Sequence, residues 1–340
     1  MPNKISAIAT LITALFLMGD RGVYAKTAGT KDARSVGNTT GNAGELWAAP
    51  VDISSRNLLY GPGGKKHQPG KTFTFLKEDL HGTNPKFDVR DENGVRWKAK
   101  LGVESQPETV ASRLLWAVGY HADEDYFLDT LQMRGVPEHL HRGHDLVASD
   151  GTVHHLRLKR DEKDRKKVGS WSWRNGPFSG TREWNGLRVL MALIDNWDLK
   201  DENNAIYEEH GKRIYEVSDL GASFGTTGVL VSKIMAKGNL GSFETSKFIT
   251  KRTPEYVDFG TPSLPSPLYV FNPWQYGRRA RLRWVGRHID RADARWIGQL
   301  LGQLSTSQLR DAFRAAGYSQ ADVTAFVQAL QTRIDQLKAL

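Results

Sequence analysis

The sequence has 340 residues, of which 39% are hydrophobic and 25% are charged, and its net charge is +9 at pH 7. This length allows one domain of two parts, or two small domains, with a substantial core. The chain contains no cysteine, which excludes disulfides, thiol catalysis and cysteine-ligated metal sites. The positive charge suits an anionic partner such as a nucleotide, but no basic run interleaved with aromatic residues indicates nucleic-acid binding.

The N-terminus has the pattern of a secretory signal peptide. Lys4 precedes an apolar run over residues 5–18, which is short for a membrane span, and residues 23–25 loosely fit a cleavage site. We therefore expect residues 1–25 to be removed and the mature protein to be exported, to the periplasm or outside the cell. An uncleaved anchor or a buried N-terminal helix is the alternative. No later stretch is apolar enough to span a bilayer, so we expect no transmembrane segment after cleavage.

A linker and a group of strands are expected next. Residues 26–55 are rich in glycine, threonine, alanine and asparagine, a composition with little to bury, which predicts a flexible linker. Apolar and polar residues then alternate in the manner of strands over 72–77, 86–90 and 95–101. The dipeptide Asn93-Gly94 predicts a tight hairpin between the second and third strands.

The third of these strands carries two lysines. Its apolar residues share one face, so Lys98 and Lys100 share the other. These two lysines are either solvated, or one of them contacts a bound anion.

A helix is expected over residues 105–119. Its apolar residues recur at helical spacing, and the glycine at position 119 can end it. Ser105 and Glu108 have the spacing of a capping box. Glu108 also lies on the helix face that is turned toward the protein, so both a capping role and an ion-pairing role are open.

Further strands are expected over 120–133 and 153–159, and a histidine-rich segment lies near them. Its members are His139, His141, His144, His154 and His155. Imidazole suits zinc, so a metal site is conceivable, and the alternative is a set of plain surface histidines. The charged run over residues 157–167 is expected at a solvated edge.

The most informative pattern lies in residues 187–221. An apolar stripe over residues 187–194 predicts a helix. A polar turn follows, and then two short β-like runs, 204–207 and 213–217, which are joined by a glycine-containing turn. The tripeptide 219–221, Asp-Leu-Gly, comes directly after the second run.

Three residues of this stretch fit one chemistry. Asp198 and Asn203 form the pattern D-x-x-x-x-N, and Asp219 begins D-L-G. Phosphoryl transfer needs a carboxylate that orients or deprotonates the acceptor, and oxygen ligands that hold Mg²⁺ against the nucleotide phosphates. Asp and Asn are also common in turns, so the specific signal is the order of helix, D-x-x-x-x-N, hairpin and D-x-G.

This stretch resembles the catalytic region of kinases. Residues 197–203, WDLKDEN, resemble the H-R-D-L-x-x-x-N loop, and residues 219–221 resemble D-F-G. The same D-x-x-x-x-N spacing is found in phosphatidylinositol 3- and 4-kinases and in HipA-type kinases. The chain is therefore similar to a divergent, exported, bacterial-type member of the kinase-like superfamily. Asn196 and Trp197 replace the His-Arg pair, so the regulatory role of that arginine is absent or reassigned.

The resemblance implies an α+β fold with two lobes. The small lobe would comprise residues 56–170, with an antiparallel sheet and one helix. The large lobe would comprise residues 171–340 and be mostly helical. Its last helices are indicated by a capping pattern at Ser305 and by an apolar stripe over residues 323–337.

The resemblance also assigns catalytic and metal-binding roles, with ATP and Mg²⁺ as cofactors. Asp198 would act as the base or orient the acceptor, and Lys200, inside the same loop, would belong to the catalytic residues. Asn203 and Asp219 would be the Mg²⁺ ligands.

Nucleotide binding is assigned to the expected small lobe. Lys100, with Lys98 as the alternative, would contact the α- and β-phosphates, and Glu108 would pair with this lysine. The turn of the first hairpin would cover the phosphates, although it lacks the full G-x-G-x-x-G. Its residues are Gly82, Thr83 and Asn84.

The sequence thus predicts an ATP- and Mg²⁺-dependent phosphotransferase with an unknown acceptor. A protein, a lipid, a sugar and a small molecule all stay open as this acceptor. A nucleotidyl transferase of the same fold, a secreted pseudokinase that binds a partner, and a histidine metallohydrolase are the alternatives. The three polar residues Asp198, Asn203 and Asp219 argue against the pseudokinase. The source of ATP outside the cytoplasm stays open.

Overall fold

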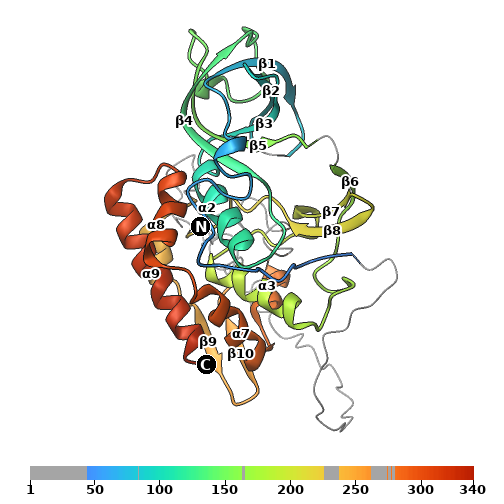
Figure 1. Cartoon of the computed structure of the whole chain (residues 1–340), viewed down its shortest axis with the longest axis vertical. Helices are drawn as coiled ribbons and strands as arrows, with labels where there is room; N and C mark the ends of the chain where they lie inside the picture. The colour runs from blue at the N-terminus through green and yellow to red at the C-terminus, as the bar shows by residue number, and fades with distance from the viewer. Residues whose placement is uncertain are drawn as a thin grey trace, which may run out of the picture. The chain divides into compact units, whose positions relative to one another are not determined.

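The computed structural model describes residues 44–82, 84–162, 165–225, 237–261, 274, 277 and 280–340 (Figure 1). The predicted signal peptide and most of the predicted linker, together with Thr83, lie outside the described residues.

Five strands close into a barrel in the order β1-β2-β3-β5-β4, drawn at the top of Figure 1. They are β1 (Thr72–Asp79), β2 (Lys86–Asp91), β3 (Arg96–Leu101), β4 (Asp125–Arg134) and β5 (Thr152–Arg160). The predicted sheet was antiparallel throughout, but the barrel closes through a short parallel pairing of β1 with β4. Because side chains alternate along each strand, apolar residues such as Phe87 and Trp97 fill the interior, and charged residues lie outside. The predicted Asn93-Gly94 turn is present, with φ +79° at the glycine.

Helix α2 (Ser105–Ala117) follows β3 and contacts β4, β5 and the later helix α8. Its N-cap is Glu104, and Ser105 already lies inside the helix. The Ser105 hydroxyl lies within hydrogen-bond distance of the backbone carbonyls of Lys100 on β3 and His155 on β5. The predicted capping box is therefore wrong, which leaves Glu108 available for an ion pair.

The charged run after β5 was predicted to be a solvated edge, and this prediction is wrong for three of its residues. Arg157 is 7% exposed, and the Lys159 and Arg165 side chains are 19% and 11% exposed. Arg157 is buried and the other two are half-buried because carboxylates pair with them: Glu108 with Arg157, Asp123 with Lys159, and Glu216 with Arg165.

A second, three-stranded sheet has the order β6-β7-β8. Its strands are β6 (Arg165–Gly169), β7 (Asn204–Glu209) and β8 (Lys212–Val217). The β7–β8 hairpin is the one predicted from the sequence. Strand β6 pairs with β7, so it belongs with the second part of the chain. The predicted boundary between the two lobes lay after residue 170 and placed these residues in the first lobe.

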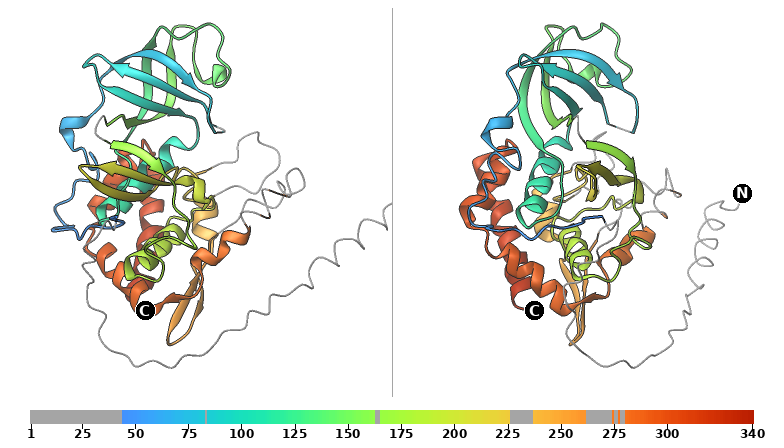
Figure 2. Two further views of the ribbon diagram at one scale, coloured as in Figure 1. Left: turned by 90° about the vertical axis from the view of Figure 1, so that its right-hand side faces the viewer. Right: turned by 45° about the vertical axis from the view of Figure 1, so that its right-hand side comes forward.

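The predicted helix before the D-L-G tripeptide is α3 (Arg182–Leu193), which begins at the N-cap Thr181. The remaining elements are α4 (Leu240–Thr245), β9 (Ile249–Arg252), β10 (Tyr256–Phe259), β11 (Ile289–Asp290), α7 (Arg291–Leu301), α8 (Thr306–Ala315) and α9 (Gln320–Lys338). The predicted capping box at Ser305 is present, and the predicted apolar stripe of α9 is buried. Helix α9 packs against α7 and α8, and the β9–β10 hairpin lies beside α7 (Figure 2).

The segment just before the barrel corrects the linker prediction, which extended to residue 55. Leu46 and Ile53 are 3% and 2% exposed and belong to the larger apolar core. Trp47 forms a β-bridge with Tyr120, and the Gln308 side chain donates to the backbone carbonyl of Ile53. A few apolar residues in a polar segment are enough to order it. In the part of the chain that the structure describes, no helix combines the length and the apolar character needed to cross a membrane.

Candidate active site

Lys100 lies at the centre of a buried group of charges. Both lysines of β3 point to the outside of the barrel, but Lys98 is exposed, whereas Lys100 is only 2% exposed. The difference arises because α2 begins directly after this end of β3 and places Glu104 and Glu108 against Lys100. Of the two predicted candidates, Lys100 is therefore the lysine that belongs to the site.

Three carboxylates surround the Lys100 ammonium group. Its Nζ lies 2.9 Å from Glu108 Oε2 and 2.5 Å from Asp219 Oδ1, and it also contacts Glu104. Burial alone would lower the pKa of Lys100, but the negative charges of Glu108 and Asp219 outweigh it, so this pKa is raised. The predicted Lys100–Glu108 ion pair is confirmed, and it extends to the D-L-G aspartate.

Asp219 occupies a sharp turn after β8, with φ +56°. Burial opposes its ionisation, but the charge of Lys100 and its hydrogen bond lower the Asp219 pKa to about 2. The side chain is 41% exposed, so a ligand from solvent can reach an ionised carboxylate. At Gly221, an added Cβ would lie 2.6 Å from the Cβ of Glu104, so the glycine permits the close approach of α2 to this turn.

The loop between α3 and β7 carries Asp198 and Lys200. Lys200 Nζ lies 3.3 Å from Asp198 Oδ2, and both side chains are partly exposed. The Trp197 amide donates to the carbonyl of Ala222, and the Phe224 amide donates to the carbonyl of Ile194. These two bonds fasten the loop to the segment that follows D-L-G, so the two motifs are held next to each other.

Asn203 is positioned by the same loop. Its Nδ2 donates to the carbonyl oxygen of Asp198 at 2.6 Å, and its own backbone carbonyl accepts from the amide of Ser218, the residue before Asp219. Because the amide nitrogen is engaged, the side-chain oxygen Oδ1 is the atom that can face a cation. Asn203 is 8% exposed and ends the short 3₁₀ helix η3 (Asp201–Asn203).

The β1–β2 turn lies over the end of α2. Asn84 Nδ2 donates to Glu104 Oε2 at 2.5 Å, which joins this turn to the Lys100 group. Gly82 has φ +74° and is exposed, and its carbonyl accepts from Arg142. Thr83, also predicted to contact phosphate, is outside the described residues.

Sequence reasoning missed several charged residues of this site. Glu104 contacts Lys100, and Lys237, from the segment before α4, contacts Glu104. Arg157 on β5 donates to Glu108 at 2.7 Å. The alternation of β5 was a usable signal for Arg157, because it places this residue on the outside of the barrel, where α2 packs.

The predicted histidine cluster does not assemble. His141 pairs with Glu78, and His155 pairs with Asp129. Among the described residues, the group of side chains whose ligand atoms lie close enough together for a metal is Glu104, Glu108 and Asp219. The metallohydrolase alternative therefore has no support in the described part of the chain.

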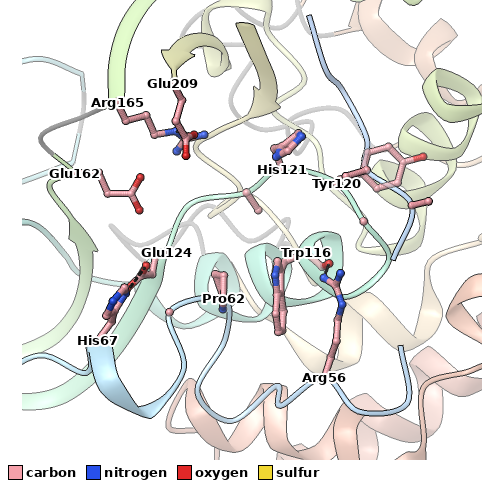
Figure 3. Close-up of a pocket in the computed structure, with 15 residues that line it drawn as sticks. Arg56, Pro62, His67, Trp116, Tyr120, His121, Glu124, Glu162, Arg165 and Glu209 are labelled. Atoms are coloured by element: carbon pink, nitrogen blue, oxygen red, sulfur yellow. Dashed lines mark hydrogen bonds and ion pairs between the residues drawn. The ribbon is translucent and has the colours of Figure 1, made fainter. Parts of the chain in front are cut away.

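A cavity of about 330 Å³ lies elsewhere (Figure 3). It is lined by Trp116, Glu124, Glu162 and Arg165 among others, and His67 pairs with Glu124 at its wall. None of its lining residues belongs to the Lys100 group. Its volume suits a small ligand, but the lysine and the carboxylates predicted to bind nucleotide and metal lie together at Lys100, outside this cavity.

Comparisons with known proteins found no matching protein-family model and no matching curated protein. Among solved structures, the chain is similar to the proinflammatory kinase CtkA of Helicobacter pylori, at 11% identity and a TM-score of 0.44, over 80% of this chain and 98% of that one. It is also similar to the Golgi casein kinase, at 10% identity and a TM-score of 0.33, over 78% of this chain and 74% of that one. Both are kinases, but these scores are low, so the proposals below depend on the residues of the site.

Proposed function

We propose that this protein is a kinase-like phosphotransferase that uses ATP and Mg²⁺. The observation that carries the proposal is the contact of Lys100 with both Glu108 and Asp219. Strand β3, helix α2 and the turn after β8 each contribute one of these residues. A strand lysine that pairs with a helix glutamate, next to the aspartate of an Asp-x-Gly turn, is the arrangement that kinases require for phosphate and Mg²⁺ binding.

The donor set of the site fits Mg²⁺. Asp219 is ionised and partly exposed, and Asn203 has a neutral amide oxygen held in place by the bond from Nδ2 to Asp198. A hard cation prefers such oxygen ligands. Asp219 and Asn203 would therefore hold the ion, which would neutralise charge on the nucleotide phosphates.

Asp198 and Lys200 would act on the acceptor side. The Asp198 carboxylate is partly exposed and can accept a hydrogen bond from an acceptor hydroxyl, which orients it and receives its proton. Lys200, at 3.3 Å from this carboxylate, would place a positive charge near the phosphoryl group that is transferred.

The test is incubation of the protein with labelled ATP and Mg²⁺, followed by intact-mass analysis and by assay of released ADP. The proposal predicts phosphate on the protein or on an added acceptor, or slow ATP hydrolysis, and Asp198→Ala should remove it. Transfer of AMP would instead establish the nucleotidyl transferase. Nucleotide binding without any turnover would favour the pseudokinase, and absence of binding would contradict the whole proposal.

We also propose that the protein is exported, because residues 5–18 form an apolar run after Lys4. The mature chain should begin near Lys26. Mass analysis of the protein from cell fractions tests this proposal, and an uncleaved chain in the cytosol would contradict it.

A further inference from the structure

Three cations form a row on the outside of the barrel, beside the candidate active site. Lys86 on β2 is the direct cross-strand partner of Lys100 on β3, and Lys100 is the direct partner of Arg157 on β5. Directly opposed side chains lie about 5 Å apart at their Cβ atoms, and like charges in such positions repel each other. Such a row is stable only when anions neutralise it.

Protein carboxylates neutralise two of the three cations. Lys100 contacts three of them, as described above. Arg157 lies 2.7 Å from Glu108 and 3.4 Å from Asp125. Because Glu108 lies between Lys100 and Arg157, this part of the row is compensated without any ligand.

Lys86 is the exception. Within the described ranges, no carboxylate lies at ion-pair distance from its ammonium group. Asp79, its direct partner on β1, is turned toward His81 instead and accepts from the His81 backbone amide at 2.9 Å. Burial is the main cause that lowers the pKa of Lys86, and the charge of Lys100 adds to it, whereas the charges of Asp219 and Glu108 raise it.

The position of Lys86 fits a phosphate. An added Cβ on Gly82 would lie 3.4 Å from Lys86 Nζ, so the ammonium group lies against the β1–β2 turn. The charges of Asp219 and Glu108 act on the same ammonium group. Lys86 therefore lies against the turn predicted to cover the phosphates, and its cross-strand partner Lys100 contacts the carboxylate predicted to hold Mg²⁺.

From these contacts we propose that Lys86 is a principal cationic contact of the nucleotide phosphates, and that Lys100 mainly holds Asp219 and Glu108 in place. This inference rests on the proposed function. The resemblance assigned the phosphate contact to Lys100 on β3. The inference gives this contact to Lys86 on β2 and leaves Lys100 the role of positioning the carboxylates. An anionic ligand bound at Lys86 would supply the ion-pair partner that this lysine lacks within the described ranges.

The experiment compares the wild type with Lys86→Met, Lys86→Arg and Arg90→Met, using calorimetric titration with Mg-ATP, with adenosine, and with metal-free tripolyphosphate. Arg90 is the matched control, because it is an exposed cation on the same strand and on the same side of the barrel. Lys86→Met should weaken Mg-ATP binding by about tenfold or more, since a charge-assisted contact is lost. It should abolish tripolyphosphate binding and leave adenosine binding unchanged.

The other variants separate charge from structure. Lys86→Arg should recover most of the Mg-ATP affinity, and Arg90→Met should bind all three probes as the wild type does. Without ligand, Lys86→Met should melt at the same temperature as the wild type or higher, because repulsion with Lys100 is removed.

Three outcomes would overturn the inference. In the first, Lys86→Met binds Mg-ATP and tripolyphosphate as tightly as the wild type does, which would leave the proposed function intact. The second is an equal loss of adenosine and Mg-ATP binding, or a lower melting temperature, since either would give Lys86 a structural role. The third is a wild-type protein that binds neither Mg-ATP nor tripolyphosphate, which would remove the proposed function as well.

Discussion

Two buried groups of charges lie in this protein, and they differ in how completely their charges are matched. One is the Lys100 group, which comprises Lys86, Lys100, Glu104, Glu108, Arg157 and Asp219. The other is the Glu216 group, which comprises Asp123, Lys159, Arg165 and Glu216. Each joins the barrel to elements that follow it in the chain.

The Glu216 group is balanced and closed. Lys159 on β5 pairs with Asp123, and Arg165 on β6 pairs with Glu216 on β8 at 2.5 Å. The ring of Tyr207 covers the Arg165 guanidinium at 4.0 Å, and the Glu216 side chain is 0% exposed. Arg165 Nη1 also lies 3.8 Å from Asp123 Oδ1, and this contact links the two ion pairs, so the group fastens the barrel to the β6-β7-β8 sheet.

The Lys100 group is open, and its three acids and three bases are not matched one to one. Asp219 is 41% exposed, and Lys86 has no carboxylate at ion-pair distance in the described part of the chain. The comparison shows that burial of charge alone does not identify a functional site. The informative feature is a buried, ordered cluster in which one charge remains exposed and another remains unmatched.

The largest expected effect is on turnover, at the loop that carries Asp198. Asp198→Ala should lower the rate of phosphoryl transfer by about a hundred- to ten-thousandfold, the usual contribution of a positioned base. Nucleotide affinity should change little, because the role proposed for Asp198 is toward the acceptor and not toward the nucleotide. Single-turnover assays together with nucleotide titration test this, and a loss of affinity without a loss of rate would contradict the assignment.

The next effect is on folding, at the Glu216 group. Arg165→Met removes the partner of a fully buried glutamate, which typically costs about 3–5 kcal/mol in the free energy of unfolding. Urea denaturation measures it. Because this group is structural, the folded fraction of the variant should still bind Mg-ATP. A stable variant that has lost nucleotide binding would remove the distinction between the two groups.

Lys100→Met should show the reverse pattern. Without the ammonium group, Glu104, Glu108 and Asp219 repel one another and the phosphates, so Mg-nucleotide binding should weaken by about tenfold or more. Lys98→Met, on the same strand but exposed, is the control and should have little effect. Equal effects of both variants in nucleotide titrations would show that the buried position of Lys100 is irrelevant.

The smallest effect concerns pH. Burial, together with the charge of Asp123, raises the pKa of Glu216 from 4.5 to about 7. The folded state therefore binds the additional proton between these two values, so the contribution of Glu216 to stability falls as pH rises from about 4.5 to about 7. Glu216→Gln should flatten the dependence of melting temperature on pH in this window. An unchanged slope would show that Glu216 stays ionised in the folded protein.

Local patterns in the sequence predicted the elements that carry the site. The apolar stripe of α3, the β7–β8 hairpin and the D-L-G turn are each encoded within a few residues, and periodicity and turn chemistry identify them. The pairing of Lys100 with Glu108 was implied by the resemblance to kinases, whereas the helix pattern alone left capping and ion pairing both open.

Contacts between distant residues were not predictable in this way. The choice between Lys98 and Lys100 depends on where α2 begins, and the role of Lys86 depends on the register of β2 against β3. Arg157 looked solvated because its partner Glu108 is 49 residues away. A single sequence gives the spacing of charges along the chain, but only the fold shows which of them are matched.

The most direct test of the proposed Mg²⁺–nucleotide site is the shift in melting temperature that ATP induces with and without Mg²⁺. Asp219 is the ionised, partly exposed carboxylate of the Lys100 group, so it should carry the metal dependence. We predict a larger shift with Mg²⁺ than without it for the wild type, a smaller but present difference for Asn203→Ala, and none for Asp219→Ala. A full Mg²⁺-dependent shift in Asp219→Ala would contradict the assignment of this site.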